Sequence, residues 1–212
     1  MNWFPIPLGP LQTNCYVLHD EHRQCLIFDP GEEADKLKAI LAEKKLRPVA
    51  ILLTHAHFDH IGAVDPIRDH YNIPVYLHEN EKKWLADPAR NGSAYFLGGE
   101  VRVRDAEHLL KHEGEMELGG FSFEVFETPG HSPGSVTFYF AEKGIVVSGD
   151  TLFMGSVGRT DLPGGNEKEL MKSIHTKLLE LPEETIVLPG HGPVTTIGDE
   201  MAANPFLHGF RN

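Results

Sequence analysis

The stretch Thr54-His55-Ala56-His57-Phe58-Asp59-His60 decides which class of fold this chain belongs to. Three imidazoles and one carboxylate lie within six consecutive residues of it. A polar loop of solvated histidines explains any one of these histidines taken alone. It does not explain the cluster, because packing imidazoles and a carboxylate together without a cation is costly to desolvate. The stretch therefore predicts a metal site.

The position of this cluster along the chain also favours a metal site. The short apolar run Ala50–Leu53 precedes it and is typical of a buried strand. The cluster is thus predicted to lie on a loop at the end of a strand, where open α/β folds place their chemistry. His55 and His57 are spaced to bind one ion from one side, whereas Asp59 and His60 leave the loop in another direction. This spacing suits two adjacent ions better than one.

Three further candidate ligands, His131, Asp150 and His191, each follow an apolar run and lie beside glycine. The runs are 121–126, 144–148 and 185–188. Taken alone, His131 or His191 is more typical of a surface loop, and Asp150 of a helix cap or turn. Together with the first cluster they give five histidines and two aspartates, which suit zinc, with iron or manganese as alternatives, and need no cysteine.

These residues resemble the metallo-β-lactamase superfamily, whose His-x-His-x-Asp-His motif is matched by residues 55–60. The later family ligands match His131, Asp150 and His191, in the family's order. The resemblance implies an α/β fold of the four-layer αββα sandwich type. It assigns the ligands as follows: His55, His57 and His131 to a first metal, Asp59, His60 and His191 to a second, and Asp150 to both. With no cysteine ligand, the set looks like the hydrolase and oxidase branches, so β-lactam hydrolysis is not expected.

The mechanism that the resemblance implies uses two adjacent cations and a hydroxide that bridges them. Metal coordination lowers the pKa of water from about 16 to near 7, so no serine or cysteine nucleophile is needed. Asp59 is the candidate catalytic residue, which orients the bridging solvent or accepts its proton while it remains a ligand.

The segment after Asp150 looks like the glyoxalase II (hydroxyacylglutathione hydrolase) subgroup. A Gly-Lys pair of that family binds the terminal carboxylate of glutathione, and Gly158-Arg159 matches it with a guanidinium that can bind a carboxylate bidentately. The alternative is that Arg159 pairs with Asp161 to hold a turn. Thr160-Asp161 replaces the family's aromatic residue, and its C-terminal helical extension is absent. The chain is therefore interpreted as a short, single-domain form that hydrolyses S-lactoylglutathione or another small-thiol thioester.

Two other functions stay open at this point. The same Gly-Arg-Thr-Asp segment also resembles persulfide dioxygenases, in which one iron on the first-site ligands oxidises a thiol persulfide. A non-catalytic metal-binding protein could display the same ligands without turnover.

Composition agrees with a compact enzyme. The chain has 212 residues and 41% hydrophobic residues, which predicts one hydrolase domain over 1–212. A net charge of −12 disfavours nucleic acid as a partner, since phosphate binding needs clustered Lys and Arg. No membrane span or signal peptide is visible, so no membrane partner and a cytoplasmic location are expected. Cys15 and Cys25 are interpreted as buried free thiols rather than a disulfide.

Periodicity and turn signals predict the remaining elements. An opening hairpin is expected from Tyr16–Leu18 and Leu26–Phe28. Helices are expected near Ala34–Lys45, Ala63–Tyr71 and Glu79–Leu85, a strand at Val75–Leu77, and a loop from Asp87 to Gly99. Asn166 with Glu169 resembles a capping box, which opens a helix with an apolar core stripe. The eight histidines outside the motifs are expected on the surface: His19, His22, His70, His78, His108, His112, His175 and His208.

Overall fold

The computed structural model describes residues 1–96 and 99–208. The chain divides into two compact units, each described here by itself. The N-terminal unit comprises Met1–Lys111 and Glu117–Phe121, and the C-terminal unit comprises His112–Met116 and Ser122–Asn212. The single domain over 1–212 stays a prediction. Within the described ranges, no helix is long and apolar enough to cross a membrane.

The N-terminal unit contains a six-stranded sheet in the order β1-β2-β3-β4-β5-β6. Its strands are β1 Asn2–Leu8, β2 Thr13–His19, β3 Gln24–Phe28, β4 Arg47–Leu52, β5 Val75–His78 and β6 His108–Leu110. The first three strands are antiparallel to one another, whereas β3 to β6 run parallel. The carboxyl ends of β3, β4 and β5 therefore meet at one edge, and the turn between β1 and β2 lies at that same edge.

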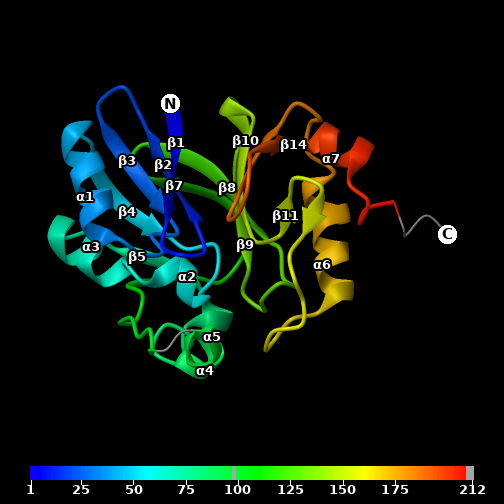
Figure 1. Cartoon of the computed structure of the whole chain (residues 1–212). Helices are drawn as coiled ribbons and strands as arrows, with labels where there is room; N and C mark the ends of the chain where they lie inside the picture. The colour runs from blue at the N-terminus through cyan, green and yellow to red at the C-terminus, as the bar shows by residue number, and fades with distance from the viewer. Residues whose placement is uncertain (97–98, 209–212) are drawn as a thin grey trace. The chain divides into compact units, whose positions relative to one another are not determined.

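Helices α1 (Ala34–Glu43) and α3 (Val64–Tyr71) cover this sheet (Figure 1). Leu37 and Leu41 of α1 and Ile67 of α3 are buried in one core with apolar strand residues, as the helical spacing of the sequence predicts. Both helices are confirmed within one or two residues of their predicted bounds. A third helix, α2 (Phe58–Ile61), begins inside the histidine motif.

The second six-stranded sheet has the order β14-β13-β10-β9-β8-β7. Its strands are β7 Gly114–Leu118, β8 Phe121–Glu127, β9 Val136–Phe140, β10 Ile145–Gly149, β13 Ile186–Pro189 and β14 Thr195–Thr196. Strands β8 and β10 are both antiparallel to β9, and β13 is parallel to β10. The carboxyl ends of β8, β10 and β13 thus face one edge. A small hairpin, β11 (Leu152–Phe153) with β12 (Ser156–Val157), follows β10.

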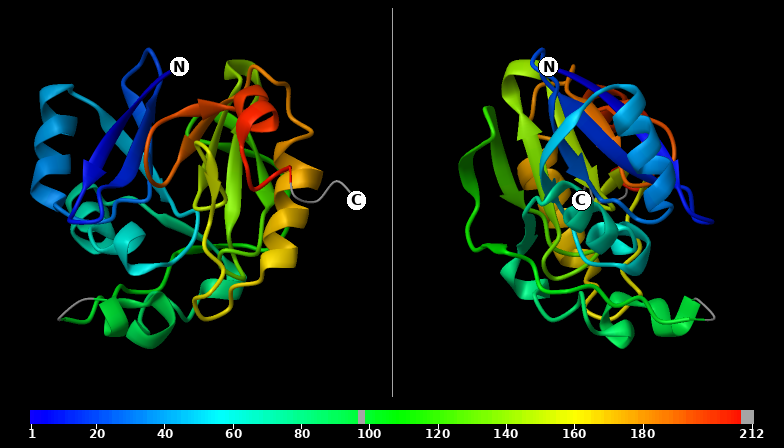
Figure 2. Two further views of the ribbon diagram at one scale, coloured as in Figure 1. Left: turned by 45° about the vertical axis from the view of Figure 1, so that its right-hand side comes forward. Right: turned by 90° about the vertical axis from the view of Figure 1, so that its left-hand side faces the viewer.

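Helix α6 (Glu167–Ser173) packs on the C-terminal unit's core and continues as a π-helical turn, η3 (Ile174–Leu178) (Figure 2). The Asn166 side chain accepts from the Glu169 backbone N–H at 3.2 Å, so the predicted N-cap is confirmed. The last helix is α7 (Ile197–Ala203). A short 3-10 turn, η2 (Ala141–Lys143), joins β9 to β10.

Some sequence predictions need correction. The helix expected over Glu79–Leu85 is only a 3-10 turn, η1 (Glu79–Glu81). The loop expected from Asp87 to Gly99 contains two short helices, α4 (Pro88–Asn91) and α5 (Ser93–Phe96). Helix α4 forms because the Asp87 side chain accepts from two backbone N–H groups and because the φ of Pro88 is fixed at the first helical position. Positions 97 and 98 of the expected loop lie outside the described residues. Strand β1 was not anticipated.

The cysteine prediction is confirmed, and the histidine prediction fails at one position. Cys15 and Cys25 are both buried and free. Burial is the main cause that raises the pKa of Cys15 and brings that of Cys25 to about 12, so both stay as unreactive thiols at neutral pH. His78 is 5% exposed and therefore not a surface residue, since it ends β5 and caps η1.

Candidate metal centre

In the N-terminal unit, the four predicted ligands lie on the loop that follows β4 and on the first turn of α2. His55 and His60 are fully buried, and His57, the N-cap of α2, is 5% exposed. The ring centroid of His55 lies 4.2 Å from that of His60 and 4.7 Å from that of His57. The loop therefore packs three imidazoles together in a nearly dry environment, as the sequence predicts.

Asp29 orients two of these histidines. It follows β3, with a backbone φ of 49°, and is 2% exposed. Its carboxylate accepts from the Thr54 backbone N–H at 2.8 Å, from the Thr54 hydroxyl at 2.6 Å and from His60 Nδ1 at 2.9 Å. Because the Thr54 hydroxyl donates to Asp29, its oxygen accepts from His55 Nδ1, 3.0 Å away. Both rings thus carry their proton on Nδ1, which makes Nε2 the candidate ligand atom of each.

Asp59 has the spacing of a ligand beside His60. Its Oδ2 lies 3.5 Å from His60 Nε2. Two ligand atoms bound tetrahedrally to one ion at bond lengths of 2.0–2.2 Å lie about 3.4 Å apart. The same Oδ2 accepts from the Thr13 hydroxyl at 2.8 Å, at the start of β2. The strand topology explains this contact, since Thr13 lies at the edge where β3 and β4 end.

Two contacts fix the backbone of the ligand loop. The Ala56 N–H, between His55 and His57, donates at 2.6 Å to the carboxylate of Glu81, which is fully buried. Gly31 packs so closely that a Cβ there would lie 1.8 Å from the Asp59 carbonyl oxygen. Only glycine fits at position 31, which ties the loop after β3 to the first turn of α2.

In the C-terminal unit, the three predicted ligands follow β8, β10 and β13, at the shared edge of the second sheet. His131 Nδ1 donates to the carbonyl oxygen of Arg159 at 2.8 Å, so Nε2 is again the candidate ligand atom. Asp150 Oδ2 lies 3.5 Å from Nε2 of His131 and 3.5 Å from Nε2 of His191. Asp150 therefore has ligand spacing to both histidines, which is the arrangement expected of a carboxylate that serves two ions.

The donor chemistry of both units fits divalent metal ions. The atoms are imidazole nitrogens and carboxylate oxygens, oriented by hydrogen bonds from their far sides, and no thiolate is among them. His191 is the most exposed of the predicted ligands, at 31% of its side chain. The assignment of all seven ligands to two particular metals stays a proposal.

The structure gives Arg159 an acidic partner on the protein itself. Its Nε and Nη2 donate to the two carboxylate oxygens of Asp161 at 2.7 and 2.8 Å. The hydrogen bond from Arg159 is the main cause that lowers the pKa of Asp161 to about 2, so this carboxylate stays ionised at neutral pH. A substrate carboxylate at Arg159 would compete with Asp161.

Packing, rather than substrate, explains the glycine that precedes Arg159. A Cβ at Gly158 would lie 1.9 Å from the carbonyl oxygen of Asp150. The Gly158-Arg159 match to glyoxalase II therefore has a structural reason for its first member. The backbone of Arg159 also belongs to the site, because its carbonyl holds His131.

Four residues that hold the predicted ligands in place were not predicted from the sequence: Asp29, Thr54, Thr13 and Glu81. One of them had a usable signal. Asp29-Pro30-Gly31 follows an apolar run, the same pattern that identified Asp150. Nothing in the sequence near Glu81 distinguishes it from a solvated glutamate, because its role depends on a contact 25 residues away.

Comparison with known proteins places these observations in a family. A family model described as the metallo-β-lactamase superfamily matches residues 8–191. Probable metallo-hydrolase YqgX of Bacillus subtilis is 55% identical over 210 residues, 99% of each chain. Hydroxyacylglutathione hydrolase GloC of Haemophilus influenzae is 37% identical over 209 residues, 98% of this chain and 99% of that one.

Two solved structures agree with this family and cover nearly the whole chain. The BLEG-1 B3 metallo-β-lactamase has a TM-score of 0.97 and 55% identity, with 98% of this chain and 100% of that one covered. TTHA1623 in a di-iron-bound form has a TM-score of 0.82 and 45% identity, with 96% and 100% covered. The predicted mixed α/β metallo-β-lactamase fold is thereby confirmed.

Proposed function

Because the chain belongs to the metallo-β-lactamase superfamily and is a metallo-hydrolase, we propose that it is a dinuclear thioesterase for hydroxyacylglutathione-like substrates. The observation that carries this proposal is the donor set: imidazole and carboxylate ligands only, with Asp150 at 3.5 Å from two histidines. The 37% identity to GloC over nearly the whole chain also supports it. The substrate is then a small-molecule thioester such as S-lactoylglutathione or a small-thiol analogue.

In the proposed site, the seven candidate ligands would hold two metal ions. His55, His57 and His131 would hold one ion, Asp59, His60 and His191 would hold the other, and Asp150 would be shared by both. When bound, divalent ions lower the pKa of water to about 7 and polarise a carbonyl oxygen. Asp59, with one oxygen fixed by the Thr13 hydroxyl, would orient the attacking water and accept its proton. Asp29 and Thr54 keep His55 and His60 in the ligating tautomer.

Zinc is the metal that we propose, and iron or manganese is compatible with the same nitrogen and oxygen donors. The similar protein TTHA1623 has a di-iron-bound form, which supports iron as an alternative metal for this chain. We further propose that the protein acts in the cytoplasm, without nucleic-acid or membrane partners.

A second candidate function comes from the similarity to BLEG-1. The lack of a cysteine ligand argued against β-lactam hydrolysis, yet BLEG-1, with 55% identity and a TM-score of 0.97, is a B3 metallo-β-lactamase. The lack of a cysteine ligand therefore does not exclude β-lactam hydrolysis by this chain. β-Lactam hydrolysis is accordingly the rival activity in the test.

The test is a substrate panel with purified protein whose zinc, iron and manganese contents are measured. We expect two metal equivalents and hydrolysis of lactoyl thioesters with a kcat/KM well above that for a β-lactam. Fast β-lactam hydrolysis with slow thioester hydrolysis would favour the second candidate. One iron with oxygen uptake on a thiol persulfide would identify a dioxygenase, and bound metal with no turnover would identify a binding protein.

The Arg159 side chain provides a sharper test of whether glutathione is the thiol of the substrate. If its guanidinium holds a substrate carboxylate, Arg159→Ala should raise KM for S-lactoylglutathione about tenfold or more and change kcat little, because a charge-assisted hydrogen bond is lost. A thioester of a neutral thiol should be unaffected. Asp161→Asn is the matched variant, since it removes the competing charge, and it should leave KM unchanged or lower it. Equal losses on both substrates would support a purely structural ion pair.

A further inference from the structure

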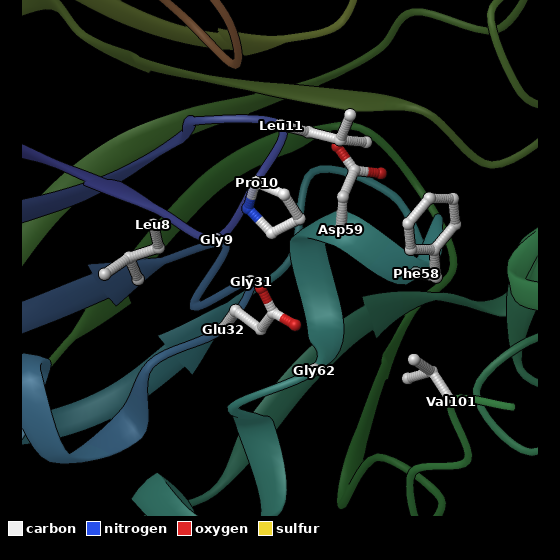
Figure 3. Close-up of a pocket in the computed structure, with 10 residues that line it drawn as sticks. All are labelled: Leu8, Gly9, Pro10, Leu11, Gly31, Glu32, Phe58, Asp59, Gly62 and Val101. Carbon is white, nitrogen blue, oxygen red and sulfur yellow. The ribbon is translucent and has the colours of Figure 1, made fainter. Parts of the chain in front are cut away.

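The N-terminal unit contains a cavity of about 120 Å³ that has the candidate ligand Asp59 in its wall (Figure 3). The turn between β1 and β2 forms one side, and the first turn of α2 forms another. Its apolar walls come from Leu8, Pro10, Leu11, Phe58 and Val101. The cavity therefore adjoins the place where the proposed chemistry takes place.

The turn that forms this cavity is held from several directions. The Gly9 N–H donates to the Glu33 carboxylate at 2.8 Å, and Lys36 Nζ donates to the Pro7 carbonyl at 2.8 Å. At the other end of the turn, Thr13 donates to Asp59 itself. The cavity thus has a fixed position relative to Asp59, as a preformed binding site requires.

The chemistry of the walls selects what can enter. Leu11 is 51% exposed although it lines the cavity, which leaves an apolar surface for a ligand to cover. Phe58 stacks on Phe96 with ring centroids 6.0 Å apart. Among the described residues that line the cavity, Glu32 is the acidic side chain besides Asp59. An anionic group would meet this carboxylate and would lose its hydration on apolar walls.

The size of the cavity limits the occupant further. A cavity of 150 Å³ lined by apolar side chains accepts a benzene molecule, so about 120 Å³ accommodates roughly four carbon atoms in a chain. Glutathione carries carboxylates and does not match these walls. The acyl side of a thioester is neutral, and its carbonyl has to reach the neighbourhood of Asp59.

We propose that this cavity is the acyl-chain pocket of the enzyme and that it selects thioesters whose acyl group is an uncharged, apolar chain of about four carbons. The pocket rests on the proposed thioesterase function. Each methylene that is buried should raise kcat/KM about fourfold. The kcat/KM of a butyryl thioester should therefore be about fifteenfold higher than that of the acetyl thioester of the same thiol.

The experiment uses the metal-loaded protein and one thiol, with acetyl, butyryl and succinyl thioesters. Succinyl has the same four carbons as butyryl, with a carboxylate in place of the terminal methyl group, so its kcat/KM should be no higher than that of acetyl. Leu11→Ala should reduce the ratio of the butyryl to the acetyl kcat/KM at least threefold. Glu32→Gln should raise the ratio of the succinyl to the butyryl kcat/KM. Met201→Ala, which truncates an exposed apolar side chain of α7, is the control and should change none of these ratios.

Two outcomes separate a failure of the pocket from a failure of the function. Rapid thioester hydrolysis with the same kcat/KM for acetyl, butyryl and succinyl would overturn the pocket and leave the thioesterase standing. If no thioester is hydrolysed, calorimetry with the non-hydrolysable S-butyl and S-methyl ethers of the thiol still tests the pocket. The pocket is supported if the S-butyl ether binds more tightly than the S-methyl ether and Leu11→Ala removes this difference. Equal binding of the two ethers would overturn the pocket.

Discussion

Asp150→Asn is expected to reduce thioester hydrolysis about a thousandfold or more while the fold survives. The substitution removes a negative charge that has ligand spacing to both His131 and His191. When bound, two cations would stabilise the charge that develops in the transition state by several kcal/mol. Because Asp150 would be shared by both ions, its substitution would weaken the contribution of each. The fold should tolerate the change because β10, which precedes Asp150, is hydrogen-bonded on both sides by β9 and β13.

Metal content, thermal unfolding and kcat/KM should be measured on the same preparation. Asp35→Asn is the matched control, since it makes the same chemical change at a fully exposed carboxylate of α1 and should alter none of the three. If Asp150→Asn keeps two metal equivalents and normal turnover, its assignment to both metals is wrong. If it unfolds the protein, His57→Ala replaces it as the test of the metal-dependent step.

The positions of the ligands could be predicted because they follow from strand order. Each cluster of candidate ligands follows an apolar run within a few residues, and parallel strands end at a common edge. The structure places His131, Asp150 and His191 after β8, β10 and β13, which share one direction. The pattern of apolar run, glycine and ligand is local, so it is visible in the sequence.

The groups that hold the ligands could not be predicted, because they depend on contacts between distant parts of the chain. Glu81 is a charged residue in a polar stretch, and only the fold shows that it is fully buried and accepts from Ala56. Thr13 meets Asp59 across 46 residues, because β2 starts at the edge where β3 and β4 end. The acyl pocket has the same origin, since it joins the β1–β2 turn to α2.

A short sequence motif can match a binding site although its side chain has another partner in the folded protein. The Gly158-Arg159 pair matches a substrate-binding motif, yet Arg159 has both Nε and Nη2 on Asp161. The ion pair of Arg159 with Asp161, which the sequence offered as the alternative, is present in the structure. This pair does not exclude substrate binding by Arg159, because Asp161 is an exposed partner and the pair's free energy in water is small.

Asp29→Ala is expected to lower metal affinity ten- to a hundredfold and to destabilise the protein by about 3 kcal/mol. The carboxylate is almost fully buried and accepts three hydrogen bonds, two from Thr54 and one from His60. Without it, His60 loses the acceptor that keeps its proton on Nδ1, and outer partners of metal-binding histidines typically affect affinity by such factors. The loss of stability follows because buried donors are left unsatisfied.

Two Thr54 variants separate orientation of the ligands from general stability. Thr54→Ser keeps the hydroxyl that donates to Asp29 and accepts from His55 Nδ1, so metal affinity should stay within a few-fold of the parent value. Thr54→Val keeps the shape and removes the hydroxyl, so affinity should fall about tenfold or more. Affinity is measured by competition with a chromophoric chelator, and stability by urea unfolding of the metal-free protein. If Asp29→Ala and Thr54→Val lower only the unfolding free energy and leave metal affinity unchanged, Asp29 stabilises the fold and does not orient the ligands.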